Sequence, residues 1–217
     1  MKAKLVWATP DADKVVGYCA RVSNPANQDN DDVTGLLRYC ARHGHWSVFE
    51  MASACIEINT TRDIARQMLR HRSLSFQEFS QRYADASLLG DMVERECRMQ
   101  DTKNRQNSLP CEDGILELGW SEWQKNVWWV ATERYKEALA AGIAKEQARA
   151  LLPEGLTPSR IYASGTLRSW IHFINVRSDV STQKEHREIA EAVREILTEV
   201  APVIIGAACR SSESAGG

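Results

Sequence analysis

Residues 70–83, with the sequence RHRSLSFQEFSQRY, constrain the fold more than any other part of this chain. They place Arg70, His71 and Arg72 side by side and then add Glu78 and Arg82. An arginine stays charged at neutral pH and needs partners for its donors, so such a segment must lie at a solvated surface or receive an anion. Phosphate is the leading candidate, because its oxygens match the planar fork of a guanidinium group.

The positive charge is local rather than global. The whole chain has 27 Lys plus Arg against 29 Asp plus Glu and a net charge of -2, so it does not suggest a nucleic-acid or membrane partner. Residues 61–83 carry five arginines against two acids, a net charge of +3. Any anion site must therefore be a local one.

Length and composition indicate an ordinary globular protein of 217 residues, and 43% of them are hydrophobic. We expect one catalytic domain over residues 1–210 and a disordered tail over residues 211–217. No apolar run approaches the roughly 20 residues that span a bilayer, so we expect no membrane association and a cytoplasmic location. The six cysteines are scattered without zinc-site spacing, which predicts free thiols in a reducing compartment and no metal site.

The first part of the chain predicts strands over residues 4–8 and 52–58 and helices over residues 11–21 and 32–42. Asp11 is expected to cap the first helix, and Gly44 to end the second. The run Thr60-Thr61-Arg62-Asp63 is expected to cap a third helix, on which Arg62, Arg66 and Arg70 recur every four residues and share one face. The polar residues beyond Arg72 are expected to form an irregular segment around a ligand.

The second part predicts a strand over residues 93–99, a polar loop over 101–111 and a long helix over 115–141. Trp120, Trp123, Val127 and either Val130 or Ala131 have core spacing on that helix, and the Trp128–Trp129 pair is most simply core. Helices follow over residues 146–152, 167–176 and 183–200, with a strand over 160–166. Helices outnumber strands without regular alternation, so the fold class is α+β, with a mixed or antiparallel sheet flanked by helices.

Two further groups of side chains could take part in chemistry, but each has a simpler structural explanation. Residues 43–50, HGHWSVFE, could bind a ligand or form a capped turn. Arg168, His172 and Arg177 lie on one predicted helix, where the histidine could instead be a core residue.

Arg149 lies among apolar residues and could bind an anion or pair with Glu146 or Glu154. The chain contains no P-loop, no GxGxxG fingerprint and no nucleophile elbow, which excludes the commonest nucleotide-binding folds. Three separated segments nevertheless supply guanidinium groups to a nearly neutral protein. A polyanionic small molecule would account for them.

The run Arg70-His71-Arg72, followed after seven residues by Ser80 and Arg82, resembles the signature of the flavin-dependent thymidylate synthases. The similarity continues in Arg21-Val22-Ser23, in residues 43–50, in Arg149 before Leu-Pro, and in Asn175-Val176-Arg177. The resemblance implies a homotetramer of α+β subunits, with each active site at a junction of subunits around FAD. It also implies dUMP, methylene-tetrahydrofolate and NADPH as substrates, and no nucleic-acid partner.

The resemblance implies two sets of site residues. The cofactor set is Ser23, His45, Ser47, Glu50, Arg70, His71, Arg72, Glu78, Thr166, Arg168 and His172. The substrate set is Gln67, Arg70, Glu78, Phe79, Ser80, Gln81, Arg82, Arg149 and Arg177. Arg82 and Arg149 would bind the phosphate, and Arg177 would be the catalytic residue that meets the uracil ring. Two positions depart from the family pattern: relatives often have Gly at the position of Gln81, and Asn occurs at the position of Thr166.

Methylation at uracil C5 requires electron density to be pushed onto that carbon. Cysteine-dependent thymidylate synthases use a thiolate within Pro-Cys-His, whereas this chain has Pro110-Cys111-Glu112, so no cysteine is assigned a nucleophilic role. In the flavin family the reduced cofactor supplies a hydride, and a fixed cation, here Arg177, stabilises charge on the uracil. Ser80 could be a nucleophile or an orienting hydroxyl. Orientation is favoured, because no histidine with a carboxylate partner lies nearby in sequence.

Two other functions are compatible with the arginines alone. The chain could be a non-enzymatic nucleotide- or RNA-binding module, or the arginines could form ion pairs at an oligomer interface. Asp63 and Glu78 interrupt the basic segment, and basic charge does not continue beyond it. This pattern weighs against a surface for long polyanions.

Overall fold

The computed structural model describes residues 1–209, which divide into two compact units. Unit 1 contains Met1–Ile58, His71–Phe76 and, within the described part, residues 162–209. Unit 2 contains Asn59–Arg70 and Gln77–Ile161. One catalytic domain over residues 1–210 stays a prediction, and the predicted tail over residues 211–217 lies outside the described residues.

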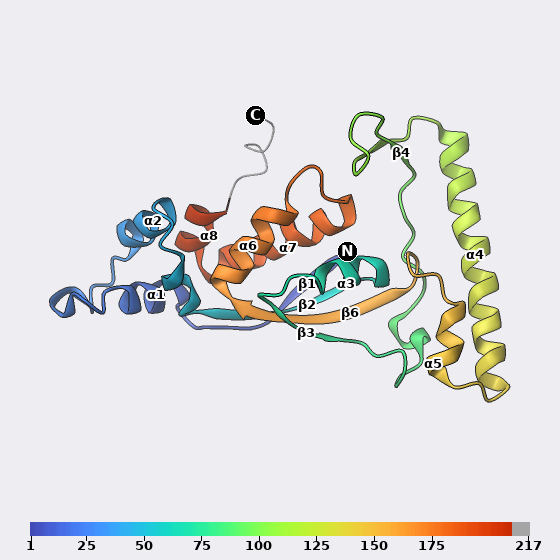
Figure 1. Cartoon of the computed structure of the whole chain (residues 1–217), viewed down its shortest axis with the longest axis horizontal. Coiled ribbons are helices and arrows are strands. Elements are labelled where there is room, and N and C mark those ends of the chain that lie inside the picture. Colours follow the sequence, from blue (N-terminus) through green and yellow to red (C-terminus); the bar gives the residue numbers. More distant parts are fainter. Residues whose placement is uncertain (210–217) are drawn as a thin grey trace. The chain divides into compact units, whose positions relative to one another are not determined.

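Four strands form one sheet in the order β1 (Lys2–Ala8), β2 (Ser53–Thr61), β6 (Pro158–Thr166) and β3 (Ser75–Glu78), as Figure 1 shows. β2 and β6 are antiparallel. The Leu167 amide donates to the Ala52 carbonyl near one end, and the Arg62 amide donates to the Thr157 carbonyl near the other. With the helices described next, this arrangement confirms the predicted α+β class.

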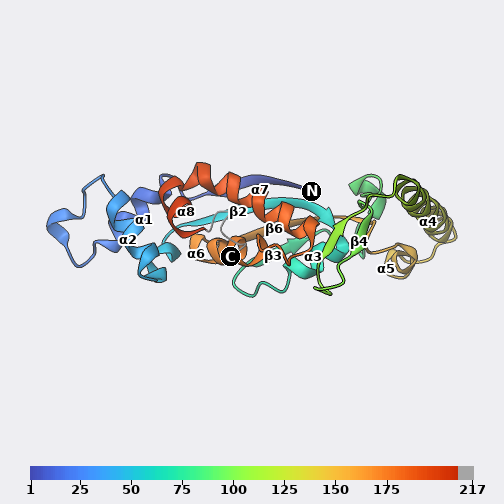
Figure 2. The ribbon, with the colours of Figure 1, turned by 90° about the horizontal axis from the view of Figure 1, so that it is seen from above.

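Unit 1 contains most of the helices. They are α1 (Ala12–Ala20), η1 (Pro25–Asn27), α2 (Thr34–Arg42), η2 (Trp46–Glu50), α6 (Leu167–Arg177), α7 (Lys184–Val200) and α8 (Pro202–Ala208). Within this unit, α6, α7 and α8 cover one face of the strands (Figures 1 and 2). The predicted alternation on β2 is confirmed, because Ala54, Ile56 and Ile58 are fully buried. Phe49, Trp170 and Phe173 are also fully buried, so a conventional apolar core positions α6.

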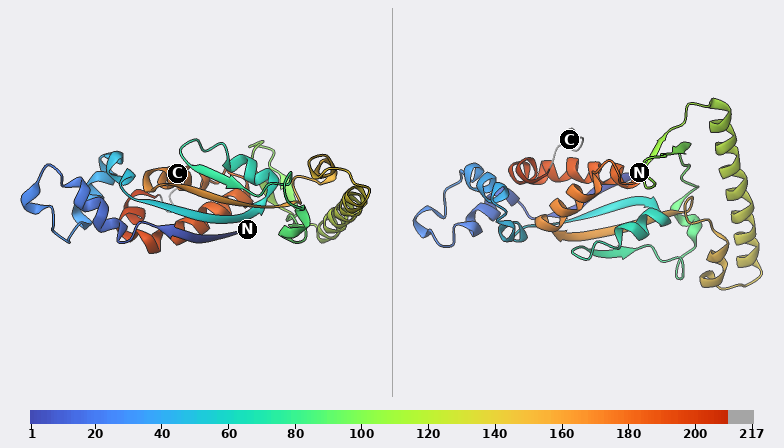
Figure 3. Two further views of the ribbon diagram at one scale, coloured as in Figure 1. Left: turned by 90° about the horizontal axis from the view of Figure 1, so that it is seen from below. Right: turned by 45° about the horizontal axis from the view of Figure 1, so that its top comes forward.

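Unit 2 contains α3 (Arg62–Met68), η3 (Ala86–Leu89), β4 (Arg98–Gln100), β5 (Ser108–Pro110), α4 (Gly114–Ala140), α5 (Lys145–Ala148) and η4 (Arg149–Leu151). β4 and β5 form an antiparallel hairpin that leads into α4, and α5 returns beside the end of α4 (Figure 3). Asp113 caps α4, because its carboxylate accepts from the amides of Ile115 and Leu116 at 2.9 and 3.1 Å.

The short strands were predicted least well. Residues 75–78 form β3 instead of an irregular segment, and the strand expected over residues 93–99 begins only at Arg98. The predicted loop over residues 101–111 contains β5, and α8 was not predicted at all. Strands of three or four residues are too short for a periodic signal, and their formation depends on partner strands elsewhere in the chain.

Two predicted helix caps are wrong in their mechanism. Asp11 precedes α1 but has a left-handed backbone with φ 47° and makes no capping side-chain hydrogen bond. Thr61 precedes α3 and also makes no capping bond. Its hydroxyl donates to the carboxylate of Asp63. The predicted stop of α2 at Gly44 is confirmed, because that residue has φ 72°.

The predicted core face of α4 is also wrong. Trp123, Val127 and Val130 are 58%, 53% and 50% exposed, and Trp129 is 66% exposed. The buried residues of α4 are Gln124, Tyr135 and Ala138. Trp128 is half-buried, and its indole N–H donates to Asp91. The large apolar side chains of α4 are spread around much of the helix without forming one distinct face, and within the described residues many of them stay exposed.

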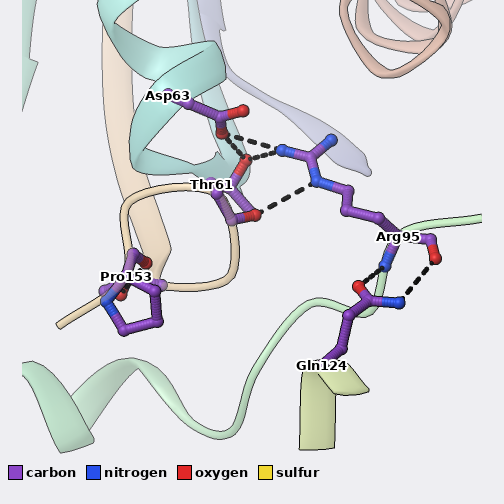
Figure 4. Close-up of polar contacts among 7 residues, drawn as sticks. Thr61, Asp63, Arg95, Gln124 and Pro153 are labelled. Atoms are coloured by element: carbon purple, nitrogen blue, oxygen red, sulfur yellow. Dashed lines mark hydrogen bonds and ion pairs between the residues drawn. The ribbon is translucent and has the colours of Figure 1, made fainter. Parts of the chain in front are cut away.

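Unit 2 contains a polar link that connects α3 and α4 (Figure 4). The Arg95 guanidinium donates to the Asp63 carboxylate at 2.7 Å, to the Thr61 hydroxyl and to the Gly155 carbonyl at 3.1 Å. The Gln124 side chain on α4 bonds to both the amide and the carbonyl of Arg95, at 2.7 and 3.0 Å. Arg95 thus connects the start of α3 to α4, a role that the sequence did not indicate.

Candidate functional site

Unit 1 has a cavity of about 580 Å³ at the side of α6, which is within the usual size for ligand sites. We call it the α6 pocket. It is lined by Trp46, Glu50, Ser73, Arg168, Ser169, Ile171, His172 and Asn175. Arg168 and Glu50 form an ion pair at 2.5 Å across it, and both side chains are about half exposed. The pocket combines an aromatic ring, a cation and several hydrogen-bonding groups, which suits a polar cofactor with a flat ring.

Local structure explains why α6 begins where it does. The hydroxyl of Thr166 accepts from the Ser169 amide at 3.3 Å and caps the helix. Gly165 precedes the cap, and a Cβ at that position would lie 2.5 Å from the Leu74 side chain. The absence of a side chain at Gly165 therefore lets residues 73 and 74 approach the start of α6, where Ser73 reaches the pocket.

His71 and Arg177, predicted to act on cofactor and substrate respectively, are in direct contact. Arg177 Nε donates to His71 Nε2 at 3.0 Å. The His71 ring also lies against Phe173 at 5.1 Å and His172 at 5.9 Å between centroids. Burial, with the charge of Arg177 and the neighbouring His172, lowers the pKa of His71 to about 4. His71 is therefore neutral at pH 7, as an acceptor from a guanidinium group must be.

Two buried histidines, His71 and His186, lead us to expect that the protein loses stability in acid. Burial and the charge of Arg177, with His71 nearby, lower the pKa of His186 to about 3. Both histidines bind protons more readily when unfolded, where the pKa is about 6.5. The free energy of unfolding is therefore highest above pH 6.5 and falls as the pH drops toward 4, by about 1.4 kcal/mol per pH unit for each histidine. Urea unfolding at several pH values measures this slope.

Two variants test whether His71 contributes to the pH dependence of the free energy of unfolding. His71→Asn is expected to make the pH dependence shallower between pH 6.5 and 4, because one of the two shifted groups is gone. His43→Asn replaces an exposed histidine of the same unit and is expected to leave the slope unchanged. An equal slope in the His71→Asn variant and the unchanged protein would contradict this assignment.

In unit 2, two of the predicted phosphate ligands lie near one residue. Arg82 Nε is 3.4 Å from the Glu146 carboxylate, and Arg149 Nε donates to the Glu146 carbonyl at 3.3 Å. Glu154, the other partner considered for Arg149, pairs instead with Arg66 at 2.5 Å. Arg82 is largely exposed, so a stronger anion could replace Glu146 as its partner.

The remaining substrate candidates of unit 2 differ in their environment. Glu78 accepts from Arg62 at 3.1 Å and from the Ser159 hydroxyl at 2.8 Å, so its carboxylate is already engaged. Gln81 is only 4% exposed, and its side-chain Nε2 is buried without a hydrogen-bond partner. A buried donor without an acceptor costs about 1–3 kcal/mol. Gln81 is therefore a group that a ligand oxygen would satisfy.

Several predicted residues have no described role in a pocket. Ser23, His45, Ser47, Arg70 and Arg72 are exposed on their own units. Ser80 is exposed as well, and in the part of the chain described here no hydrogen bond joins its hydroxyl to a histidine. Gln67 on α3 and Phe79 after β3 are half-buried. The Phe79 amide donates to the Arg160 carbonyl at 2.9 Å, which fixes the start of the Ser80 segment.

Four polar or aromatic residues of the α6 pocket were missed by the sequence analysis: Trp46, Ser73, Ser169 and Asn175. Trp46 belongs to residues 43–50, and Asn175 belongs to the Asn-Val-Arg run, so both were near a recognised pattern. Ser169 is one residue beyond Arg168, and Ser73 one beyond Arg72. Ser73 lies beside α6 only because the backbone folds back on itself there, so the spacing of residues in the sequence could not have identified it.

Two other properties follow from the described residues. No group of three or more His, Cys, Asp and Glu side chains among residues 1–209 is arranged to hold a metal ion. No helix in the same range is long and apolar enough to cross a membrane.

The fold is similar to that of a methylating enzyme of known structure. The crystal structure of a UMP/dUMP methylase, PolB, from Streptomyces cacaoi bound with 5-Br UMP superposes with a TM-score of 0.81 at 27% identity, covering 95% of this chain and 92% of that chain. The structure of the same protein bound with 5-Br dUMP gives a TM-score of 0.76 at 28% identity. The fold is therefore that of a class of proteins that includes pyrimidine-nucleotide methylases.

Sequence comparison identifies the family. The family model Thy1, thymidylate synthase complementing protein, matches residues 4–203. A flavin-dependent thymidylate synthase from Synechocystis sp. is 52% identical over 196 residues, covering 89% of this chain and 87% of the relative. A probable flavin-dependent thymidylate synthase of Paramecium bursaria Chlorella virus 1 is 46% identical over 212 residues, covering 94% and 97%. The chain belongs to this family, and the resemblance inferred from residues 70–83 is confirmed.

Proposed function

We propose that this protein is a flavin-dependent thymidylate synthase, which methylates dUMP to dTMP with methylene-tetrahydrofolate as the one-carbon donor and FAD reduced by NADPH. The observation that carries the proposal is the 52% identity to a flavin-dependent thymidylate synthase over nearly the whole chain. The residues of both units fit the chemistry, as the next paragraphs argue.

FAD is assigned to the α6 pocket. Its volume of about 580 Å³ and its lining of Trp46, Arg168 and His172 suit a flavin ring beside a charged group. Arg168 is also half exposed, so it can bind an anionic oxygen of the cofactor and still contact Glu50. The other cofactor residues of the proposal are Ser23, His45, Ser47, Glu50, Arg70, His71, Arg72, Glu78 and Thr166. FAD, when bound, supplies the hydride that the methylation requires.

dUMP is assigned to the segment after β3. Arg82 and Arg149, which both contact Glu146, would bind the phosphate, and the unsatisfied Nε2 of Gln81 would donate to an oxygen of the nucleotide. The remaining substrate residues are Gln67, Arg70, Glu78, Phe79 and Ser80. The structural neighbour PolB, a UMP/dUMP methylase solved with 5-Br UMP and with 5-Br dUMP, supports this substrate class.

Arg177 is assigned the catalytic role. A guanidinium group does not lose its proton at neutral pH, so Arg177 acts as a fixed cation that stabilises negative charge on the uracil ring. Neutral His71 accepts from Nε of Arg177 at 3.0 Å. His71 therefore orients Arg177 in addition to any contact with the cofactor.

The active enzyme is proposed to be a cytoplasmic homotetramer with active sites at subunit interfaces. The exposed apolar residues of α4 support self-association: Ile115, Leu118, Trp123, Val127, Trp129 and Val130. The six free cysteines suit a reducing compartment. Light scattering of the purified protein measures the mass of the assembly, and a monomer at micromolar concentration would contradict the tetramer.

The visible spectrum of the purified protein tests flavin binding. The protein reconstituted with FAD is expected to be yellow after removal of free cofactor and to lose its flavin absorption when NADPH is added without oxygen. Arg168→Ala is expected to weaken FAD binding, and Arg38→Ala, an exposed residue on α2, serves as the control. A protein that neither retains FAD nor responds to NADPH would overturn the proposal.

Ser80→Ala is expected to retain activity. An orienting hydroxyl contributes about one hydrogen bond, so kcat/KM for dUMP is expected to fall by roughly tenfold. Loss of a true nucleophile would instead remove nearly all turnover. Steady-state kinetics distinguishes the two roles, and complete loss of turnover with intact dUMP binding would revive Ser80 as the nucleophile.

The alternative of a non-enzymatic RNA-binding module receives no support from the structure. Arg62, Arg66 and Arg82 pair with Glu78, Glu154 and Glu146 inside unit 2. The arginines therefore form no uninterrupted cationic face of the kind that a long polyanion requires.

A further inference from the structure

Two of the free cysteines, Cys97 and Cys111, lie opposite each other at the open end of the β4–β5 hairpin. The hairpin pairs Arg98 with Pro110, Met99 with Leu109 and Gln100 with Ser108. Continuing this antiparallel register by one residue pairs Cys97 with Cys111. Directly opposed residues in antiparallel strands have Cα atoms about 4.5–5.5 Å apart. A disulfide requires about 4.4–6.8 Å, so the register itself is suitable.

Cross-strand partners in an antiparallel pair lie on the same face, so the register also places both side chains on one side of the hairpin. Partial removal from water, together with the neighbouring Cys111, raises the pKa of the Cys97 thiol. Both cysteines are free and partly exposed, so a small reagent can reach them. Arg98 strengthens the hairpin beside them, because its guanidinium donates to the Ser108 hydroxyl at 2.8 Å and to the Ser108 carbonyl.

We propose that Cys97 and Cys111 form a reversible disulfide across the base of the β4–β5 hairpin when the protein meets a small-molecule disulfide. One thiolate attacks the reagent, forms a mixed disulfide and releases one small thiol. The second thiolate then displaces the other small thiol and completes the Cys97–Cys111 bond. The two cysteine thiols are oxidised, the reagent is reduced to two thiols, and the two protons leave with them.

The position of this bond gives it a structural consequence. Cys97 is two residues from Arg95, which contacts Thr61 and Asp63 at the start of α3. Cys111 is two residues from Asp113, which caps α4. The disulfide would close the loop of residues 97–111 and fasten the Arg95 segment to the start of α4. In a reducing compartment such a bond is transient, which is typical of redox-sensitive cysteine pairs.

Oxidised glutathione and the full-length protein test the proposal. After incubation, alkylation under denaturing conditions is expected to label two fewer cysteines than in reduced protein, and dithiothreitol should restore them. Peptide mass mapping without reduction is expected to find the peptides of Cys97 and Cys111 linked, at a rate independent of protein concentration. Cys19→Ser, which replaces another partly exposed cysteine, should behave like the unchanged protein.

Cys111→Ser supplies the matched negative variant. This variant should not form the linked peptide and should instead retain glutathione on Cys97 as a stable mixed disulfide. That mixed disulfide would show that the reagent reaches Cys97. The proposal is overturned if the unchanged protein also stops at the mixed disulfide. It is equally overturned if the linked peptides come from other cysteines, or if the rate of linkage rises with protein concentration.

Discussion

Replacement of Arg177 by alanine is expected to lower kcat for dTMP formation by roughly 10³-fold, the size of effect seen when a fixed electrostatic group is removed from an active site. The reason is that Arg177 is the cation assigned to the uracil ring, and neutral His71 cannot take over its charge. FAD binding is expected to survive, because the α6 pocket is lined by other residues. Single-turnover kinetics with the FAD-loaded protein measures the methylation step, and the visible spectrum measures bound flavin.

Two variants sharpen this result. Arg177→Lys keeps the positive charge but loses the Nε contact with His71, so it is expected to recover only part of the rate. Arg38→Ala replaces an exposed arginine of the same unit and should leave kcat unchanged. Turnover in the Arg177→Ala variant within tenfold of the unchanged protein would show that this residue is not the catalytic cation.

Arg95→Met is expected to cause the largest loss of stability, roughly 3 kcal/mol, because it leaves Asp63 without its cation and two polar partners without a donor. Arg95 is largely buried and bonds to Thr61, Asp63 and Gly155 (Figure 4). Methionine preserves much of the side-chain volume, so the change tests the polar contacts rather than a cavity. Urea unfolding followed by circular dichroism gives the free energy of unfolding.

The control is Arg134→Met on α4, where an exposed arginine pairs with Glu137. An exposed ion pair of this kind contributes about 0.5 kcal/mol or less, so this variant is expected to unfold almost as the unchanged protein does. Equal stability of the Arg95→Met and Arg134→Met variants would contradict the role of Arg95 as the link between α3 and α4.

The sequence predicted the family and the long elements well, because their signals are local. Residues 70–83 carry the family signature within one short segment, and the alternation of Ala54, Ile56 and Ile58 on β2 is a property of one strand. Thr61 and Arg95 illustrate the limit. A threonine before a helix usually caps it, but here its hydroxyl is used by Asp63 and Arg95. The partner comes from a segment more than thirty positions away, which is not visible in local spacing.

The candidate site was predicted in part for the same reason. Arg168 and His172 are one helical turn apart, and both line the α6 pocket together with Glu50. Ser73 reaches that pocket only because Gly165 permits a close approach of Leu74. The apolar residues of α4 were recognised, but their predicted burial was wrong, since spacing along a helix does not show which surface covers its side chains.

Formation of dTMP in a single anaerobic turnover tests the central claim most directly. The FAD-loaded protein, reduced with NADPH and freed of excess reductant, is mixed with dUMP and methylene-tetrahydrofolate and then analysed for nucleotide and for flavin absorption. The account predicts dTMP in an amount equal to the flavin reoxidised, and the same yield from a variant in which all six cysteines are replaced. Recovery of unchanged dUMP beside fully reduced flavin, or loss of dTMP in the folded cysteine-free variant, would contradict it.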